Sequence, residues 1–95
     1  MYVVAILPMK DPELSRIHRE AHVAYMTELR GEGKIWAMGV FPDGQGGMAI
    51  FQVPTLEDGR RLAEADPYIT TGARSLLLYP WEPAAPVAAI EAPAL

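Results

Sequence analysis

The order in which apolar runs and amphipathic segments alternate constrains the fold of this chain more than any other feature. The first apolar run stops at Pro8 and precedes a long segment in which apolar residues recur at spacings of three and four. Two more apolar runs, a second amphipathic segment and a final apolar run follow. The pattern predicts strands at 2–7, 35–41, 48–53 and 75–81, and helices at 12–32 and 55–65.

The long amphipathic segment carries the end signals of a helix. Asp11 is placed as an N-cap, and Pro12 as the first helical residue, where a missing N–H loses no helical bond. Gly31 and Gly33 suit its C-terminal end, because glycine enters the left-handed region without a Cβ penalty. The face predicted to turn toward the core carries Leu14, Ile17, Ala21, Tyr25 and Leu29.

The other boundaries follow from turn residues. The segment 42–47, with its Asp-Gly and Gly-Gly steps, joins two strand patterns and predicts a β-hairpin. Thr55 suits the cap of the second helix. Asp66 before Pro67 predicts the end of that helix, because a residue that precedes proline is driven out of the α region.

The resulting order, β-α-β-β-α-β, is the split βαβ arrangement of ferredoxin-like α+β folds. The unbroken apolar run 2–7 suits a central strand covered on both faces, yet the predicted helices cover only one face of such a sheet. A second copy of the chain is the simplest cover for the other, giving a homodimer and a dimeric α+β barrel. Residues 1–82 are predicted to form one domain, and 83–95, rich in alanine and proline, a tail.

Composition excludes several classes of function. Eight basic and twelve acidic residues give a formal charge of −4, and no basic stripe is present that would bind nucleic acid. Because the chain has no cysteine, it has no disulfide, thiolate nucleophile or zinc-ribbon site. The run before Pro8 is too short to span a membrane or act as a signal segment. We therefore predict a cytoplasmic protein with no nucleic-acid or membrane partner.

Three short motifs resemble the YciI-like (YCII-related) family. They are Arg19-Glu20-Ala21-His22 on the first predicted helix, Gly33-Lys34 before a strand that carries Gly39, and Asp66-Pro67-Tyr68 ahead of Gly72. The resemblance covers residues 2–81. It departs from the family pattern after the second strand, where Gly39-Val40-Phe41-Pro42 replaces a glycine followed directly by proline. The loop beside the cleft is therefore expected to differ.

The resemblance implies a dimeric α+β barrel whose cleft lies near a histidine–aspartate pair, which His22 and Asp66 match. For most of the family no reaction is established. One branch resembles enzymes that eliminate halide from chlorinated lactone-like intermediates of aromatic breakdown. The resemblance therefore predicts the fold more closely than the substrate.

His22 is the candidate acid–base residue, because imidazole exchanges a proton near neutral pH without special surroundings. Asp66 at the other ring nitrogen would fix the tautomer and stabilise the imidazolium. The structural alternative is that His22 lies at the edge of the apolar stripe and only closes the core boundary. Asp66 has a matching alternative as an ordinary turn residue before proline.

The spacing of His18 and His22, four residues apart on one helix face, is also that of two metal ligands. A metal site is disfavoured, because Arg19 lies between them in the sequence and no third ligand is evident. The glycine-rich segment 43–47 joins two strands and opens no helix, so it is not a phosphate loop. We predict neither a metal nor a cofactor.

The residues predicted to bind substrate are Arg19, Trp36, Gly39, Tyr68 and Arg74. Arg19 and Arg74 could hold a carboxylate in a bidentate pair, and surface solvation is the alternative for each. Gly39 belongs to the motif that borders the cleft. Aromatic and methionine side chains of the predicted strands and turns could line an apolar pocket, or else belong to the core or a dimer interface: Trp36, Met38, Phe41, Tyr68 and Trp81.

Two functions follow from these residues. The first is a cofactor-independent enzyme in which His22, oriented by Asp66, moves a proton on a small polar cyclic substrate, in an isomerisation, lyase or dehalogenase-like reaction. The second is a non-catalytic dimeric module that binds a small molecule or serves an accessory role. A structural dimer whose pocket is filled by side chains or by the 83–95 tail is a third reading. A histidine in reach of Asp66 beside an apolar pocket would favour the enzyme.

Overall fold

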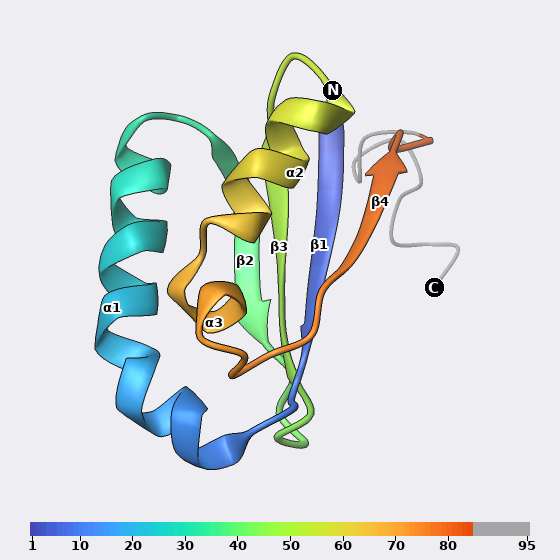
Figure 1. The fold of residues 1–95 in the computed structure, drawn as a ribbon. Helices are drawn as coiled ribbons and strands as arrows, with labels where there is room; N and C mark the ends of the chain where they lie inside the picture. The colour runs from blue at the N-terminus through green and yellow to red at the C-terminus, as the bar shows by residue number, and fades with distance from the viewer. Residues whose placement is uncertain (85–95) are drawn as a thin grey trace.

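The computed structural model describes residues 1–84 of the chain as a four-stranded antiparallel sheet with helices packed on it (Figure 1). The strand order is β2-β3-β1-β4. The ferredoxin-like α+β fold predicted from the order of the segments is therefore confirmed. The predicted tail lies outside the described residues from residue 85 onward. The elements are β1 (Tyr2–Pro8), α1 (Pro12–Gly31), β2 (Ile35–Val40), β3 (Gly46–Gln52), α2 (Leu56–Glu64), α3 (Pro67–Thr70) and β4 (Leu77–Trp81).

The helix starts are fixed by the capping residues that the sequence indicates. Asp11 accepts a hydrogen bond from the backbone N–H of Leu14 at 3.0 Å, at the start of α1. Thr55 does the same for Asp58 at 3.1 Å, at the start of α2. Each bond satisfies an N–H that has no partner within its own helix.

One short helix, α3, is absent from the sequence prediction. The Asp66-Pro67 step was counted only as the end of α2. The same two residues also begin a helix, because Asp66 accepts from the N–H of Tyr68 at 2.9 Å and Pro67 occupies its first turn. The last strand, predicted from Ser75, begins at Leu77.

The core lies between one face of the sheet and the helices. Along β1 every second side chain is buried, namely Val3, Ala5 and Leu7, and Phe51 of β3 lies beside Val3. Helix α2 approaches this strand so closely that a Cβ added at Gly59 would lie 2.8 Å from the side chain of Val3. A glycine at this position therefore sets the helix-to-sheet distance.

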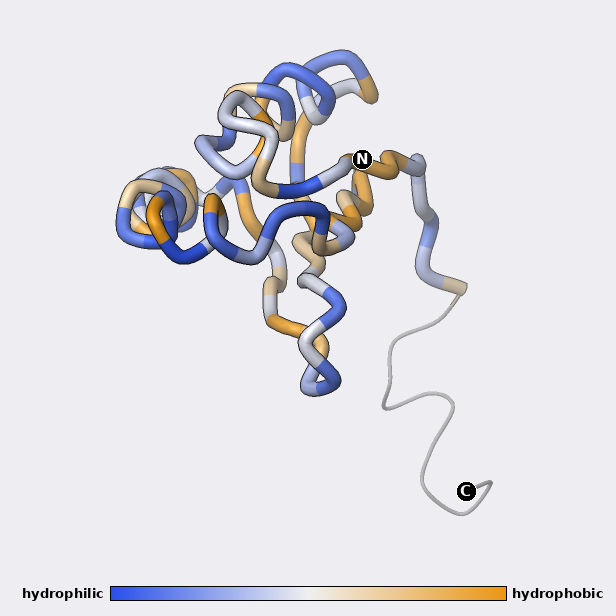
Figure 2. The backbone as a smooth tube through the Cα atoms, turned by 60° about the horizontal axis from the view of Figure 1, so that its bottom comes forward, coloured by the Kyte–Doolittle hydropathy of each residue, from blue (hydrophilic) through white to orange (hydrophobic). Residues whose placement is uncertain are grey.

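The opposite face of the sheet is apolar but not covered by α1, α2 or α3 within residues 1–84 (Figure 1). The rings of Tyr2, Trp36 and Trp81 contact one another there, with centroids 5.4 to 6.2 Å apart. Leu77 and Tyr79 of β4 are about half exposed. In Figure 2 helix α1, at the left, carries mixed hydrophilic and hydrophobic colours, and further hydrophobic stretches lie near the centre of the molecule. In a single chain β1 is thus covered on one face, not on both.

The apolar spacing of helix α1 predicts only part of the face that it turns to the sheet. Leu29 is buried, and Leu14 and Tyr25 pack against the core, as predicted. Ile17 is 53% exposed and Ala21 is exposed, whereas Ser15 and Met26 are buried. The inward face carries polar side chains because part of it borders a cavity and not the apolar core. The apolar stripe is therefore wrong at Ile17 and Ala21 and right at its two ends.

Candidate active site

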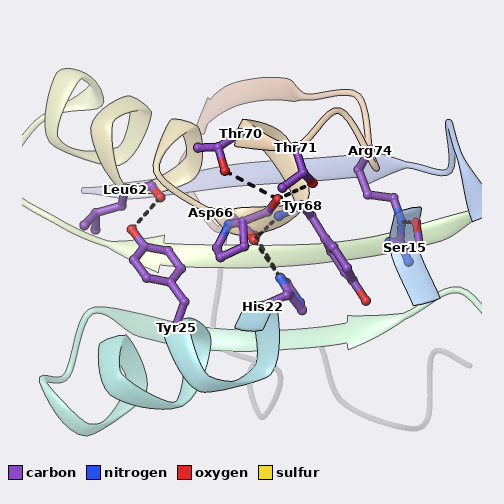
Figure 3. A network of polar contacts seen from close by, with 10 residues as sticks. Ser15, His22, Tyr25, Leu62, Asp66, Tyr68, Thr70, Thr71 and Arg74 are labelled. Atoms are coloured by element: carbon purple, nitrogen blue, oxygen red, sulfur yellow. Dashed lines mark hydrogen bonds and ion pairs between the residues drawn. The ribbon is translucent and has the colours of Figure 1, made fainter. Parts of the chain in front are cut away.

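The polar centre of the fold is a contact between α1 and the start of α3 (Figure 3). Nδ1 of His22 lies 2.8 Å from Oδ1 and 2.9 Å from Oδ2 of Asp66. The Asp66 side chain is only 3% exposed, while the His22 side chain is 21% exposed. Because an ionised carboxylate can only accept, this geometry assigns the proton to Nδ1 and leaves Nε2 as the free nitrogen of the neutral ring.

Asp66 is held in place by its role as a helix cap. Its Oδ1 accepts from the backbone N–H of Tyr68, while both of its oxygens face His22. Asp11 makes the same cap at the other Asp-Pro step but does not contact a histidine. The turn interpretation of Asp66 and the site interpretation are therefore compatible, since one carboxylate serves both contacts.

Tyr68 lies between His22 and Arg74 (Figure 3). Its ring is stacked on the His22 imidazole, with centroids 3.9 Å apart and planes 11° apart. The Arg74 guanidinium carbon lies 4.3 Å from the centroid of the same ring, a cation–π contact. The orientation of the imidazole is thus fixed by two contacts, a hydrogen bond at its edge and an aromatic ring on its face.

Arg74 is held from its other side by Ser15 of α1. The Nε–H of Arg74 donates to Oγ of Ser15 at 3.0 Å, and that hydroxyl lies 3.2 Å from the carbonyl of Ala73, to which it donates. Ser15 is only 5% exposed. Nothing in the local sequence reveals this role of Ser15, because its partner Arg74 lies 59 residues away.

These side chains border a cavity of about 480 Å³ between α1 and the sheet. A volume of this size is typical of sites for single-ring or two-ring ligands. Most of its lining is apolar, and it includes the four methionines Met9, Met26, Met38 and Met48. The cavity also has polar edges, where His22, Tyr68 and Arg74 lie.

Most of the residues predicted to form a site come together at this cavity. Arg19, His22, Gly39, Tyr68 and Arg74 all line it, and Asp66 lies directly behind His22. Trp36 does not join them, because its ring packs with Tyr2 and Trp81 on the opposite face of the sheet. Of the other predicted lining residues, Met38 borders the cavity.

The charged residues of the lining all have the same sign. They are Arg16, Arg19 and Arg74, and no carboxylate lines the cavity. Within residues 1–84, no three histidine, aspartate or glutamate side chains gather as metal ligands would. None of the helices in the same range is both long and apolar enough to cross a membrane.

Tyr25 extends the polar contacts toward α2. Its hydroxyl donates to the carbonyl of Leu62 at 2.7 Å. Burial raises the pKa of this phenol above its usual value of 10.0, and the negative charge of Asp66, followed by Glu28 and Glu32, adds to the increase. Tyr25 therefore joins α1 to α2 through a neutral hydroxyl, and it is not among the residues that line the cavity.

Comparison with known families decides what kind of chain this is. Residues 1–82 match the YCII-related domain, which covers every element of the fold described above. The chain belongs to the YCII-related family. This membership agrees with the motifs at His22, Gly39 and Asp66 on which the resemblance rested.

The relatives of this YCII-related chain include an uncharacterised protein and a solved enzyme. The chain is 26% identical over 82 residues to the uncharacterised protein YjpA of Bacillus subtilis (strain 168), which covers 86% of this chain and 96% of that protein. It is also similar to the 5-chloro-2-hydroxyhydroquinone dehydrochlorinase TftG of Burkholderia phenoliruptrix AC1100, solved with 2,5-dihydroxybenzoquinone. That likeness has a TM-score of 0.71 over 86% of this chain and 94% of TftG, at 19% identity. At this identity the likeness shows a common fold.

Proposed function

We propose that this YCII-related protein is a cofactor-independent acid–base enzyme in which His22, oriented by Asp66, acts on a small polar cyclic substrate. The observation that carries the proposal is the contact of His22 Nδ1 with both oxygens of the buried Asp66, beside a cavity of about 480 Å³. A base, a group that orients it and an adjoining pocket are the parts that proton-transfer catalysis needs.

In the proposed reaction Nε2 of His22 accepts a proton from a hydroxyl or an acidic carbon of the substrate ring. The electron pair left behind forms a new double bond. In an elimination the leaving group departs with its bonding electrons, so the substrate loses one proton and one anion. In an isomerisation the same proton returns to a different carbon. Asp66 stabilises the imidazolium that exists between the two steps.

The relationship to TftG makes the elimination the first reaction to test. TftG is a dehydrochlorinase of a chlorinated hydroxyhydroquinone, and the two chains share the same fold. The cavity of this protein is large enough for a single substituted ring. We therefore propose a dehalogenase-like elimination, with isomerisation of a related ring or lactone as the other outcome of the same base.

Chloride release tests this function directly. The protein is incubated with 5-chloro-2-hydroxyhydroquinone and with chlorinated lactones, and free chloride is measured against a buffer blank. The expected result is release above the blank that is lost in His22→Gln. If no cyclic substrate turns over while the same compounds still bind, the protein is a non-catalytic binding module and the enzyme proposal is wrong.

We further propose that two copies pair through the helix-free face of the sheet, defined here by Tyr2, Trp36, Leu77, Tyr79 and Trp81. These side chains are apolar or aromatic, and the last four are each about two-fifths to one-half exposed in the single chain. A face of this composition is unfavourable in water and suits burial against a copy of itself. The barrel that results is the dimeric α+β arrangement expected from the sequence.

A further inference from the structure

The three arginines of the cavity are not equivalent. Arg16 is already paired with Glu13, and its side chain is 70% exposed. Arg19 and Arg74 are paired with no carboxylate within residues 1–84. Of these two, Arg74 has contacts that fix its orientation. The Arg74 side chain is therefore already ordered. A ligand that binds it avoids the entropic cost of ordering this side chain.

Two buried side chains fix Arg74. Ser15 accepts from Nε at 3.0 Å, and the guanidinium carbon lies over the Tyr68 ring, 4.3 Å from its centroid. Both residues are only 5% exposed. One of the five guanidinium donors is used by Ser15, so the donors of the terminal nitrogens remain for an acceptor. The fixed plane and the remaining donors suit a planar, anionic oxygen group.

Tyr68 offers a ligand its hydroxyl and not its face. Both faces of the ring are occupied, one by His22 and the other by Arg74. The Tyr68 hydroxyl makes no hydrogen bond within residues 1–84. In the same range every fully buried side-chain oxygen has a partner, so this hydroxyl is not fully buried. The hydroxyl therefore reaches the open space of the cavity that Tyr68 lines. It is a second donor beside Arg74.

We propose that the cavity binds a single planar ring through an anionic oxygen group held by Arg74 and the Tyr68 hydroxyl, with Ser15 as the positioning residue for Arg74. The inference rests on the proposed function, since it assigns this cavity to the substrate. It goes further by naming the class of substrate, a small aromatic or quinonoid anion. The His22 ring, stacked on the far face of Tyr68, then lies beside the bound ring.

The rest of the lining supports a ring as the body of this ligand. Met9, Met26 and Met38 are adaptable thioethers, and methionine sulfur makes favourable contacts with aromatic ring edges. Gly39 contributes no side chain to the wall. An apolar wall opposite fixed donors selects a ligand with one anionic end and one flat, apolar body.

Benzoate and benzamide test the inference, because they share a shape and differ in charge. Backbone amide NMR titrations at constant ionic strength compare wild type with Arg74→Gln, Arg16→Gln, Ser15→Ala and Tyr68→Phe. Wild type is expected to bind benzoate several-fold more tightly than benzamide. Arg74→Gln should weaken benzoate about tenfold, and Ser15→Ala and Tyr68→Phe about threefold each. Arg16→Gln removes the same charge from the lining and should change benzoate affinity less than about twofold.

Three results would overturn the inference: equal affinity for the two probes, equal losses in Arg74→Gln and Arg16→Gln, or no saturable shift with benzoate. Circular dichroism confirms that each variant is folded. The readout is independent of turnover, so the two proposals can fail separately. Benzoate selectivity without chloride release would contradict only the enzyme, whereas chloride release without selectivity would contradict only the anion site.

Discussion

Nδ1 of His22 lies within 2.9 Å of both carboxylate oxygens of Asp66, although 44 residues separate them in the sequence. Oδ1 of the same carboxylate caps α3 by accepting from the N–H of Tyr68. The start of a helix and the orientation of the imidazole are therefore fixed by one buried side chain. Any change at Asp66 alters both, and the two effects can be measured separately.

We expect Asp66→Asn to reverse the tautomer of His22. The amide oxygen must take the place of Oδ1, because it is needed to accept from Tyr68 N–H. The amide NH₂ then faces Nδ1 and donates to it, which moves the ring proton to Nε2. Ring ¹⁵N chemical shifts report this directly. They should show protonated Nδ1 in neutral wild type and protonated Nε2 in the variant.

Asp11→Asn is the matched control for this change. Asp11 occupies the same Asp-Pro cap at the start of α1, without a histidine partner. Asp11→Asn should leave the ¹⁵N chemical shifts of the His22 ring at their wild-type values. Identical ring shifts in wild type and Asp66→Asn would exclude Asp66 as the group that orients the base.

In the chloride-release assay the same Asp66→Asn substitution should lower the rate about a hundredfold to ten-thousandfold. A base with a proton on the nitrogen that faces the substrate cannot accept another, and comparable losses follow when an aspartate that orients a catalytic histidine is changed to asparagine. The expected loss is in kcat, with little change in KM. A loss confined to KM would indicate that Asp66 shapes the cavity only.

Gly59→Ala should destabilise the fold by about 1–3 kcal/mol, although alanine favours helices by about 1 kcal/mol over glycine. The new methyl group would lie 2.8 Å from a side-chain carbon of Val3, which is fully buried. Urea denaturation measures the change. Gly31→Ala, in α1 with nothing within 4 Å of the added carbon, should be neutral or stabilising. Stabilisation by both substitutions would show that α2 can move away from β1.

Stability should fall at alkaline pH in a way that depends on Tyr25. The pKa of this phenol is raised in the folded chain, chiefly by burial and then by the charge of Asp66. The unfolded chain therefore loses the phenol proton first. The contribution of Tyr25 is complete below the usual value of 10.0 and is lost as pH rises through the higher folded value.

Denaturation midpoints at several pH values from about 8 to 11 test this dependence. Tyr25→Phe should show a smaller loss of stability between pH 9 and 11 than wild type. An equal slope in wild type and Tyr25→Phe would assign the alkaline transition to other groups.

The proposed dimer predicts a mass of twice the chain in light scattering. Trp36→Lys on the helix-free face should shift the protein to monomer, because the pairing would bury an unpaired charge at the interface. Ile17→Lys is a matched control, since Ile17 and Trp36 are each 53% exposed but Ile17 lies on α1. A monomeric wild type, or equal effects of the two substitutions, would contradict pairing through this face.

Local signals in the sequence were sufficient for the order of strands and long helices. Alternation, three- and four-residue spacing and the caps at Asp11 and Thr55 act over a few residues, so the ferredoxin-like arrangement followed from them. The motifs also indicated His22 and Asp66 as a pair. Helix α3 was missed because the Asp66-Pro67 step was interpreted as an end only, although it is also a start.

Tertiary structure decided which side chains face the cavity. Trp36 lies at a register shift between Ile35 and Ala37, so alternation along β2 cannot assign its face. Ile17 is exposed, although its spacing predicts burial, and Ser15 is buried, because the cavity lies beside this part of α1. The bond from Arg74 to Ser15 joins residues 59 apart. The sequence by itself therefore determined the elements and their order, because those depend on neighbouring residues. The faces and the long-range polar contacts depend on packing between elements, and only the folded chain decided them.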